Sequence, residues 1–259
     1  MRYRKSRDIE GQPKNKKVAI VAGKVFVSIQ TEQEVEPVMH PSTSVVGVDW
    51  GVVNFATMSN GEVVGQCAPL EQHARKLGKF ERRLARKKKF SNNWKKAKAR
   101  ISRLHQRIAN SRKDFIHKTS DSISKNHAVV VVEDLQVKNM SKSARKNVKA
   151  KSGLNRSILD ASPFELRRQL KYKMRWRGGL LVAVSPGNTS RSCPECGHVA
   201  AENRKTQARF ACVACGFRAP ADLVAAWNIK EAGLASLACS RPSGEVSPSC
   251  QEPTEGFAA

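Results

Sequence analysis

The chain has 259 residues and a formal net charge of +25, from 47 Lys and Arg against 22 Asp and Glu. Such an excess repels itself unless a polyanion neutralises it, and the commonest polyanion is nucleic acid. A hydrophobic fraction of 40% excludes a wholly disordered tail, and apolar runs of at most five residues exclude a membrane span or signal peptide, so we expect a soluble, intracellular nucleic-acid-binding protein.

The N-terminal part predicts two groups of short strands. Strands are expected at 18–21, 25–30, 45–48, 53–58 and 63–64. Ala22-Gly23-Lys24 and Ser59-Asn60-Gly61 supply the turns of two hairpins. The acidic, Pro-containing stretch 32–44 is typical of a connection between units.

Apolar residues at a spacing of three and four predict an antiparallel helical hairpin over 70–126, broken at Ser91-Asn92-Asn93. Residues 71–118 hold 18 Lys and Arg and three acidic residues, a net of +15. These runs lack the acidic partners of a salt-bridged helix surface, so we predict phosphate contact rather than a merely solvated face. The expected nucleic-acid-binding residues are Arg82, Arg83, Arg86, Lys87, Lys88, Lys89, Lys95 and Lys96.

In the C-terminal half, strands and helices alternate. Buried strands are predicted at 128–132 and 180–184, and a polar, basic loop at 138–154. Ser162-Pro163-Phe164-Glu165 predicts a capping box that begins a helix running to about Trp176, with Gly178-Gly179 as its end. A last helix is expected at 223–232, ended by Gly233. The Ser-, Pro- and Gly-rich remainder is predicted to be disordered.

Four of the seven cysteines form two CxxCG units, Cys193–Gly197 and Cys212–Gly216, and an odd cysteine count without an export signal argues against a disulfide scaffold. Two tight turns that each deliver two sulfurs supply the four thiolates of tetrahedral zinc, and the closed shell predicts a structural metal. The glycine after each pair permits the positive φ of such a turn. We call the segment that carries these two cysteine pairs the ribbon. The cations around it suit contact with DNA or RNA: Arg191, Arg204, Lys205, Arg209 and Arg218.

Three acidic residues stand at predicted strand ends or a helix start: Asp49, Glu133 and Asp222. A carboxylate beside an apolar strand is costly unless it is paired or metal-bound, and three together would bind Mg²⁺ or Mn²⁺. Two such ions can activate water and stabilise the leaving oxygen of a phosphodiester. The spacing alone leaves alternatives: Asp49 as a turn residue, Asp222 as a helix N-cap, and Asp134 rather than Glu133 as the inward group.

Together these motifs resemble the TnpB (OrfB) family, which insertion sequences encode, which is often labelled transposase, and which is related to type V CRISPR effectors. The resemblance covers about 18–229, in order. It is carried by Gly47-Val-Asp49-Trp-Gly51, 130–135, 154–162, 189–197, 212–216 and 222–229.

The resemblance implies an α/β fold, an RNase H-like (RuvC) domain with an inserted basic helical hairpin and a C-terminal four-cysteine zinc ribbon. It also implies that Asp49, Glu133 and Asp222 are catalytic acids that hold Mg²⁺ or Mn²⁺. The implied activity is RNA-guided cleavage of DNA, with DNA and a guide RNA as partners, no membrane, and a cytoplasmic, nucleoid-associated location in a prokaryote. The expected divisions are a remnant of a wedge-like β-domain with its linker (1–44), the core (45–191) with its hairpin (70–126), the ribbon (192–218), the last RuvC motif and helix (219–234) and the tail (235–259).

Some positions depart from the family pattern. Trp50 replaces the usual Leu, and Val224 replaces an Asn near the third acid, which we expect to remove a polar group and reduce activity. Only 18–30 resembles strands of the wedge-like barrel. We therefore expect the chain to lack most of that barrel and the recognition lobe, which would impair guided cutting.

Two other functions stay open. One is a non-catalytic nucleic-acid-binding protein, such as an RNA-guided repressor, which predicts the loss of at least one acid although all three are present. The other is a transposase that joins strands itself, against which the ribbon before the third acid argues.

Overall fold

The computed structural model describes residues 8–34, 36, 38–142 and 147–239, so the tail from residue 240 and part of the predicted loop at 143–146 lie outside it. No helix in those ranges is both long enough and apolar enough to cross a membrane. Contacts divide the chain into two compact units, 1–39 with 67–118 and 40–66 with 119–259.

The first unit contains the predicted N-terminal hairpin. Strands β1 (Gln12–Val21) and β2 (Lys24–Glu32) pair antiparallel and are longer than the sequence predicts. Ala22 and Gly23 both have positive φ, 48° and 82°, as a two-residue type I′ turn requires. The turn prediction is therefore confirmed.

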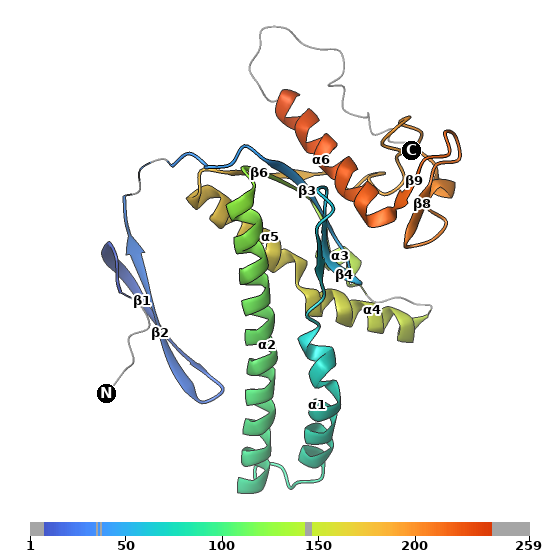
Figure 1. Ribbon diagram of the computed structural model, residues 1–259. Coiled ribbons are helices and arrows are strands. Elements are labelled where there is room, and N and C mark those ends of the chain that lie inside the picture. The colour runs from blue at the N-terminus through green and yellow to red at the C-terminus, as the bar shows by residue number, and fades with distance from the viewer. Residues whose placement is uncertain (1–7, 35, 37, 143–146, 240–259) are drawn as a thin grey trace, which may run out of the picture. The chain divides into compact units, whose positions relative to one another are not determined.

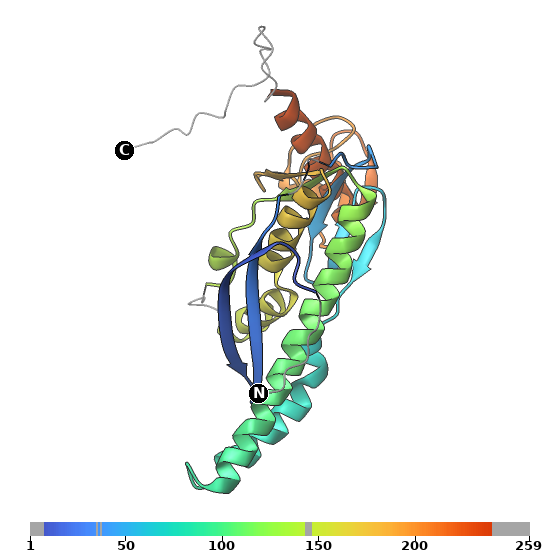
Figure 2. The same cartoon turned by 90° about the vertical axis from the view of Figure 1, so that its left-hand side faces the viewer.

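The same unit contains two helices, α1 (Pro69–Ala85) and most of α2 (Asn92–Asn126). They lie side by side in both views (Figures 1 and 2), as the periodicity predicts. Ser91, predicted as a break, caps α2, because its Oγ accepts a hydrogen bond from the Trp94 N–H at 3.2 Å.

A five-stranded sheet of order β5-β4-β3-β6-β7 forms the centre of the second unit (Figure 1). Its strands are β3 (Val45–Trp50), β4 (Asn54–Met58), β5 (Val63–Gly65), β6 (Val129–Glu133) and β7 (Leu180–Val184). Strands β3, β6 and β7 are parallel, whereas β4 and β5 are antiparallel to their neighbours. The five strands of this sheet confirm those predicted at 45–48, 53–58, 63–64, 128–132 and 180–184. However, β7 is an edge strand with Leu180 46% exposed, so the expectation that it is buried was wrong.

The segment before α5 (Pro163–Trp176) differs from the prediction. The predicted loop 138–154 contains the short α3 (Val137–Met140) and the start of α4 (Val148–Ala161). The capping box was also wrong. Ser162 adopts a left-handed conformation between α4 and α5, and its Oγ donates back to the Leu159 carbonyl at 2.9 Å. Its side chain is therefore used to end α4 and makes no cap on α5.

Two predicted helix ends have opposite outcomes. At the end of α5, the Gly179 N–H donates to the Met174 carbonyl at 2.9 Å, and the Gly178 N–H donates to the Arg175 carbonyl at 3.3 Å. This is a Schellman motif, so that prediction is confirmed. Gly233 does not end a helix, because α6 runs over Ala221–Cys239. A Cβ at Gly233 would lie 2.4 Å from the Val131 side chain, so close packing requires this glycine.

Helix α6 covers one face of the sheet, and α5 covers the other. On the α6 side, a Cβ at Gly47 would lie 2.2 Å from the Ala226 carbonyl oxygen. On the α5 side, Val48 of β3 and Leu170 of α5 line the same cavity of about 50 Å³. Because side chains alternate along a strand, odd-numbered residues of β3 and β6 face α6.

We predict that Gly47→Ala lowers the free energy of unfolding by about 2 kcal/mol or more, because the added methyl meets backbone that cannot turn aside. Chemical denaturation measures the loss. Gly65→Ala is the matched control, since a Cβ at that strand position has nothing within 4 Å. Equal unfolding free energies for both variants would contradict the packing described here.

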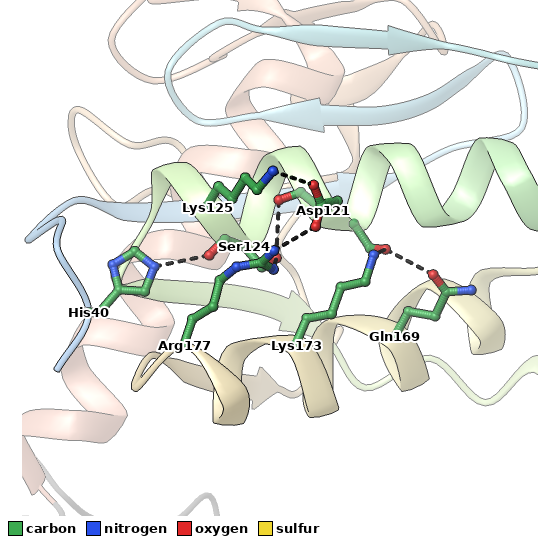
Figure 3. A network of polar contacts seen from close by, with 8 residues as sticks. His40, Asp121, Ser124, Lys125, Gln169, Lys173 and Arg177 are labelled. Atoms are coloured by element: carbon green, nitrogen blue, oxygen red, sulfur yellow. Dashed lines mark hydrogen bonds and ion pairs between the residues drawn. The ribbon is translucent and has the colours of Figure 1, made fainter. Parts of the chain in front are cut away.

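A polar network joins the last turns of α2 to α5 within the second unit (Figure 3). Asp121 accepts from Arg177 at 2.6 Å and from Lys125 at 2.9 Å. These partners lower the pKa of Asp121 to about 2. The buried Lys173 ammonium donates to Ser120 Oγ at 2.8 Å, and Ser120 donates to Gln169 at 2.9 Å. The end of α2 is thus fixed on the core by paired polar groups, as their burial requires.

Candidate functional site

The parallel register brings two of the predicted acids together. Gly47 of β3 pairs with Val131 of β6. Asp49 and Glu133 lie two residues further along their strands, so they are neighbours at the carboxyl ends of β3 and β6, on the face that α6 covers. Asp222 lies in the first turn of α6, one turn before the Ala226 carbonyl that packs on Gly47. Two strands and one helix start thus converge on one corner of the sheet.

The structure resolves the alternatives that the sequence left open. Asp49 is a strand residue of β3 and not a turn residue. Asp222 lies inside α6, which begins at Ala221, so it is not the N-cap. Asp134 forms an ion pair with Arg167 of α5, whereas Glu133 shares the face of Asp49. The inward group is therefore Glu133.

The pKa of Asp49 is raised from its usual 3.8 to about 7, mainly because burial disfavours its charged form. The charges of Glu133 and Asp222 raise it further, and that of Arg204 lowers it. Burial also raises the pKa of Glu133, against a hydrogen bond from Thr189 that lowers it. The corner therefore holds more negative charge than its own cation offsets.

Three residues that orient the acids were not recognised from the sequence in this role. Thr189 Oγ1 donates to Glu133 at 2.5 Å. Arg204, expected only as a nucleic-acid contact, donates to Asp222 at 3.2 Å. The Asn228 side-chain amide donates to the Thr189 carbonyl at 2.7 Å and to the Ser192 carbonyl at 2.8 Å, which fixes this segment on α6. Thr189 and Asn228 belong to motifs quoted above, but only the fold shows what they contact.

We predict that Asp49→Asn stabilises the protein at pH 8 in buffer free of added divalent metal. A raised folded-state pKa favours the protonated folded form, so this group's contribution is greatest below pH 4 and is lost as the pH rises to about 7. Asparagine cannot ionise and does not incur this loss, which is at most about 4 kcal/mol. Thermal melts of both proteins at pH 4 and pH 8 measure the effect. A variant no more stable than the wild type at pH 8 would contradict the raised pKa.

The four predicted cysteines form a cluster. Their Sγ atoms all lie within 4.8 Å of one another, and within the described residues this is the only group of three or more potential metal ligands with that spacing. The Sγ atoms of Cys193 and Cys215 are 3.6 Å apart, and so are those of Cys196 and Cys212. Four sulfurs at about 2.3 Å from one ion would be about 3.8 Å apart, so the cluster fits a single tetrahedral metal.

Local backbone geometry shapes the two turns that carry these sulfurs. Gly197 and Gly216 have φ of 72° and 77°, as the CxxCG spacing predicts. Backbone N–H groups of Cys215 and Ala214 lower the pKa of the Cys212 thiol to about 6 against the effect of burial. The thiolate, which is the form that binds metal, is thereby favoured at Cys212. Burial and the neighbouring sulfurs instead raise the pKa of the Cys215 thiol to about 12, against a backbone hydrogen bond that lowers it.

The cysteine cluster and the start of α6 share one small core. Phe210 of β8 (Arg209–Ala211) packs with Cys193, Cys212 and Val224, all of them buried. Strand β8 pairs with β9 (Arg218–Pro220), which leads directly into α6 (Figure 1). Val224 thus lies in an apolar cluster, so the expectation that it deprives the acids of a polar neighbour receives no support from its surroundings.

The eight cations predicted to contact nucleic acid, from Arg82 to Lys96, are all exposed. In the part of the chain that the structure describes, none of them forms an ion pair. Around the ribbon, Arg191, Lys205, Arg209 and Arg218 are also exposed, whereas Arg204 is engaged by Asp222. Most of the predicted basic surface is therefore available to a polyanion.

Two family profiles match the chain. The OrfB_IS605 profile, described as "Probable transposase", matches residues 28–144. The profile described as "Cas12f1-like, TNB domain" matches residues 164–229, which include the cysteine cluster and Asp222.

Among individual proteins, the chain is 51% identical over 98% of its length to the "Putative RNA-guided DNA endonuclease InsQ" of Escherichia coli K12. It is 36% identical over 87% of its length to a "Putative RNA-guided DNA endonuclease" of Streptomyces pristinaespiralis. The chain spans 65% and 55% of these two relatives. A cryo-EM structure of a Cas12f1–sgRNA–target DNA complex shares the fold over 82% of this chain and 55% of that one, with a TM-score of 0.50 and 21% identity.

Proposed function

Because the chain belongs to the TnpB (OrfB_IS605) family, we propose that it is a metal-dependent DNA endonuclease guided by RNA. The observation that carries the proposal is the convergence of Asp49, Glu133 and Asp222 on one corner of the sheet. DNA as the substrate and RNA as the guide are proposed from the names of its relatives, which are called putative RNA-guided DNA endonucleases. The activity would be exercised on DNA in the cytoplasm.

The fold proposed for this activity is RNase H-like, of RuvC type. The central mixed sheet with helices on both faces supports it. The proposed core is 45–191, with the basic hairpin 70–126 inserted between β5 and β6. The ribbon is 192–218, and 219–234 returns the third acid to the core. Residues 1–44 would belong to a preceding β-domain.

The residues at the corner fit Mg²⁺ or Mn²⁺, because carboxylate oxygens are the ligands that these ions prefer. The raised pKa of Asp49 supports this fit, since a bound cation would relieve the repulsion from Glu133 and Asp222. Such ions activate water and stabilise the leaving oxygen of a phosphodiester.

The chain's own residues hold the acids ready for this role. Thr189 orients one Glu133 oxygen, and Asn228 holds the Thr189 segment against α6. Arg204 offsets the charge of Asp222 and must give way or share that carboxylate when a cation enters. For the cysteines we propose structural Zn²⁺, because four thiolates leave no open position for a substrate.

The exposed cations of α1 and α2 are proposed to bind the phosphates of nucleic acid. We predict that replacing Arg82, Arg83, Arg86 and Lys87 by Gln flattens the salt dependence of binding, because fewer counterions are released. If all four contact duplex phosphates, the slope of log K against log salt decreases by about 3 to 4. Titrations of labelled DNA at several salt concentrations measure the slope.

The matched control replaces Arg82, Arg83 and Arg86 by Lys and leaves Lys87 unchanged, so that all four positive charges are kept. Its slope should equal that of the wild type, since counterion release depends on charge. An unchanged slope in the neutral variant would place the phosphate contacts elsewhere.

The competing non-catalytic function predicts the loss of at least one acid, and the presence of all three counts against it. The test of the proposal is to purify the protein from its host, sequence the bound RNA and assay cleavage of DNA matched to that RNA with added Mg²⁺. Failure to cut, with RNA bound, would contradict the proposed endonuclease activity.

A further inference from the structure

Two aromatic side chains lie at the turn between α1 and α2. Phe90 is 65% exposed, and Trp94, in the first turn of α2, is partly exposed. Their ring centroids are 5.5 Å apart and the planes are tilted by 59°. Neither residue was singled out by the sequence, because apolar residues at this spacing usually pack in a core. Here one of them points outward from the turn.

Local interactions hold the pair in place. Phe90 has a φ of 67°, a left-handed conformation that a bulky residue rarely adopts. Ser91 then caps α2 through the Trp94 N–H. A strained residue next to a capped helix start gives the rings a defined position without burial in a core.

Cations surround these rings. The Lys89 ammonium lies 5.2 Å from the Phe90 ring centroid, and the Lys98 ammonium lies 5.0 Å from that of Trp94. Lys87, Lys88, Lys95 and Lys96 are exposed nearby in the sequence. No acidic residue occurs between Glu81 and Asp114, so the turn presents aromatic rings within continuous positive charge.

We infer that the Phe90–Trp94 pair is a stacking site for unpaired bases of RNA. An exposed aromatic ring offers a flat surface to any base that has left its stack, and neighbouring lysines bind the phosphates on either side. Cations alone would serve a duplex equally well, but the rings have no role on a duplex whose bases are already stacked.

RNA is the occupant because folded RNA displays unpaired bases in loops, bulges and ends, where proteins stack aromatic side chains on them. Double-stranded DNA displays none until it is opened. The inference rests on the proposed function for its RNA partner, and it adds which part of that partner is bound and by which residues.

The test compares Phe90→Leu/Trp94→Leu with the wild type, using the full chain without Mg²⁺. The probes are a labelled RNA hairpin with a loop of unpaired uridines, a blunt RNA duplex with the same number of phosphates, and a single-stranded DNA of the loop sequence. We expect the variant to bind the hairpin about tenfold more weakly, as loss of one stacked base would cause, and the duplex as the wild type does. The salt slope should not change, because no charge is removed.

The matched control is Tyr172→Leu/Trp176→Leu, which removes an aromatic pair of α5 in which Trp176 is 72% exposed, with ring centroids 4.7 Å apart and the Arg168 guanidinium 5.7 Å from the Tyr172 ring centroid. It should leave hairpin binding unchanged. Equal losses on hairpin and duplex, no loss on the hairpin, or a loss confined to single-stranded DNA would each overturn the inference and leave the proposed function standing. Failure of the wild type to bind any RNA would overturn both.

Discussion

Asp49→Ala is expected to abolish cleavage of guide-matched DNA, with the rate reduced by about a thousandfold or more. The charges of both Glu133 and Asp222 raise the pKa of Asp49, so Asp49 interacts with both of the other carboxylates. Removing one member of a catalytic unit costs nearly as much as removing the unit, because the remaining groups cannot hold the metal ions together. The measurement is single-turnover cleavage with the RNA that copurifies with the protein, at several Mg²⁺ and Mn²⁺ concentrations.

Asp134→Ala is the matched control for this experiment. Asp134 directly follows Glu133 but forms its ion pair with Arg167 of α5. The Asp134→Ala variant should therefore retain cleavage, whereas Glu133→Ala should behave like Asp49→Ala. Binding of DNA and RNA should be nearly equal in all three variants, because the cations of α1 and α2 are untouched. Undiminished cutting by Asp49→Ala would show that the active site lies elsewhere.

The strands could be predicted because their local pattern agrees with their place in the fold. Residues 129–132 are a run of valines that only a strand covered on both faces would bury, and β6 is that strand. The strand prediction also placed Asp49 and Glu133, because parallel strands bring their carboxyl ends to one edge. Deciding between Glu133 and Asp134 needed the register, which the sequence does not contain.

Other parts of the fold depend on contacts between distant residues. Helix α4 contains Gly153 and several polar residues, so its local preference is weak, and buried residues near its end, such as Ile158, stabilise it. A glycine such as Gly233 is typical of a helix end, yet here the close packing against Val131 explains why the residue is a glycine. Arg204 precedes Asp222 by 18 positions, and only the ribbon's fold brings them together. Sequence spacing cannot predict such pairs.

The small core around Phe210 connects the cysteine cluster, which is the proposed zinc site, with the start of α6, so the zinc prediction also tests the proposed active site. Cys212→Ser is expected to reduce bound metal from about one zinc per chain to nearly none. The binding free energy of a structural zinc is folding free energy, about 10–16 kcal/mol in small zinc domains, so the ribbon should unfold with it. Phe210 and Val224 would lose their shared core, and the first turn of α6, which carries Asp222, would lose its support.

Cleavage should therefore be lost in Cys212→Ser although every acid is still present, and proteolysis should begin in 192–218. Cys67→Ser is the matched control, because Cys67 is also a thiol but lies outside the cluster. It should retain one zinc per chain and full cleavage. Elemental analysis of the purified proteins, with limited proteolysis and the same cleavage assay, measures all three effects. Full zinc content in Cys212→Ser would mean that the four sulfurs do not form the metal site, and loss of zinc with intact cleavage would mean that the ribbon does not support Asp222.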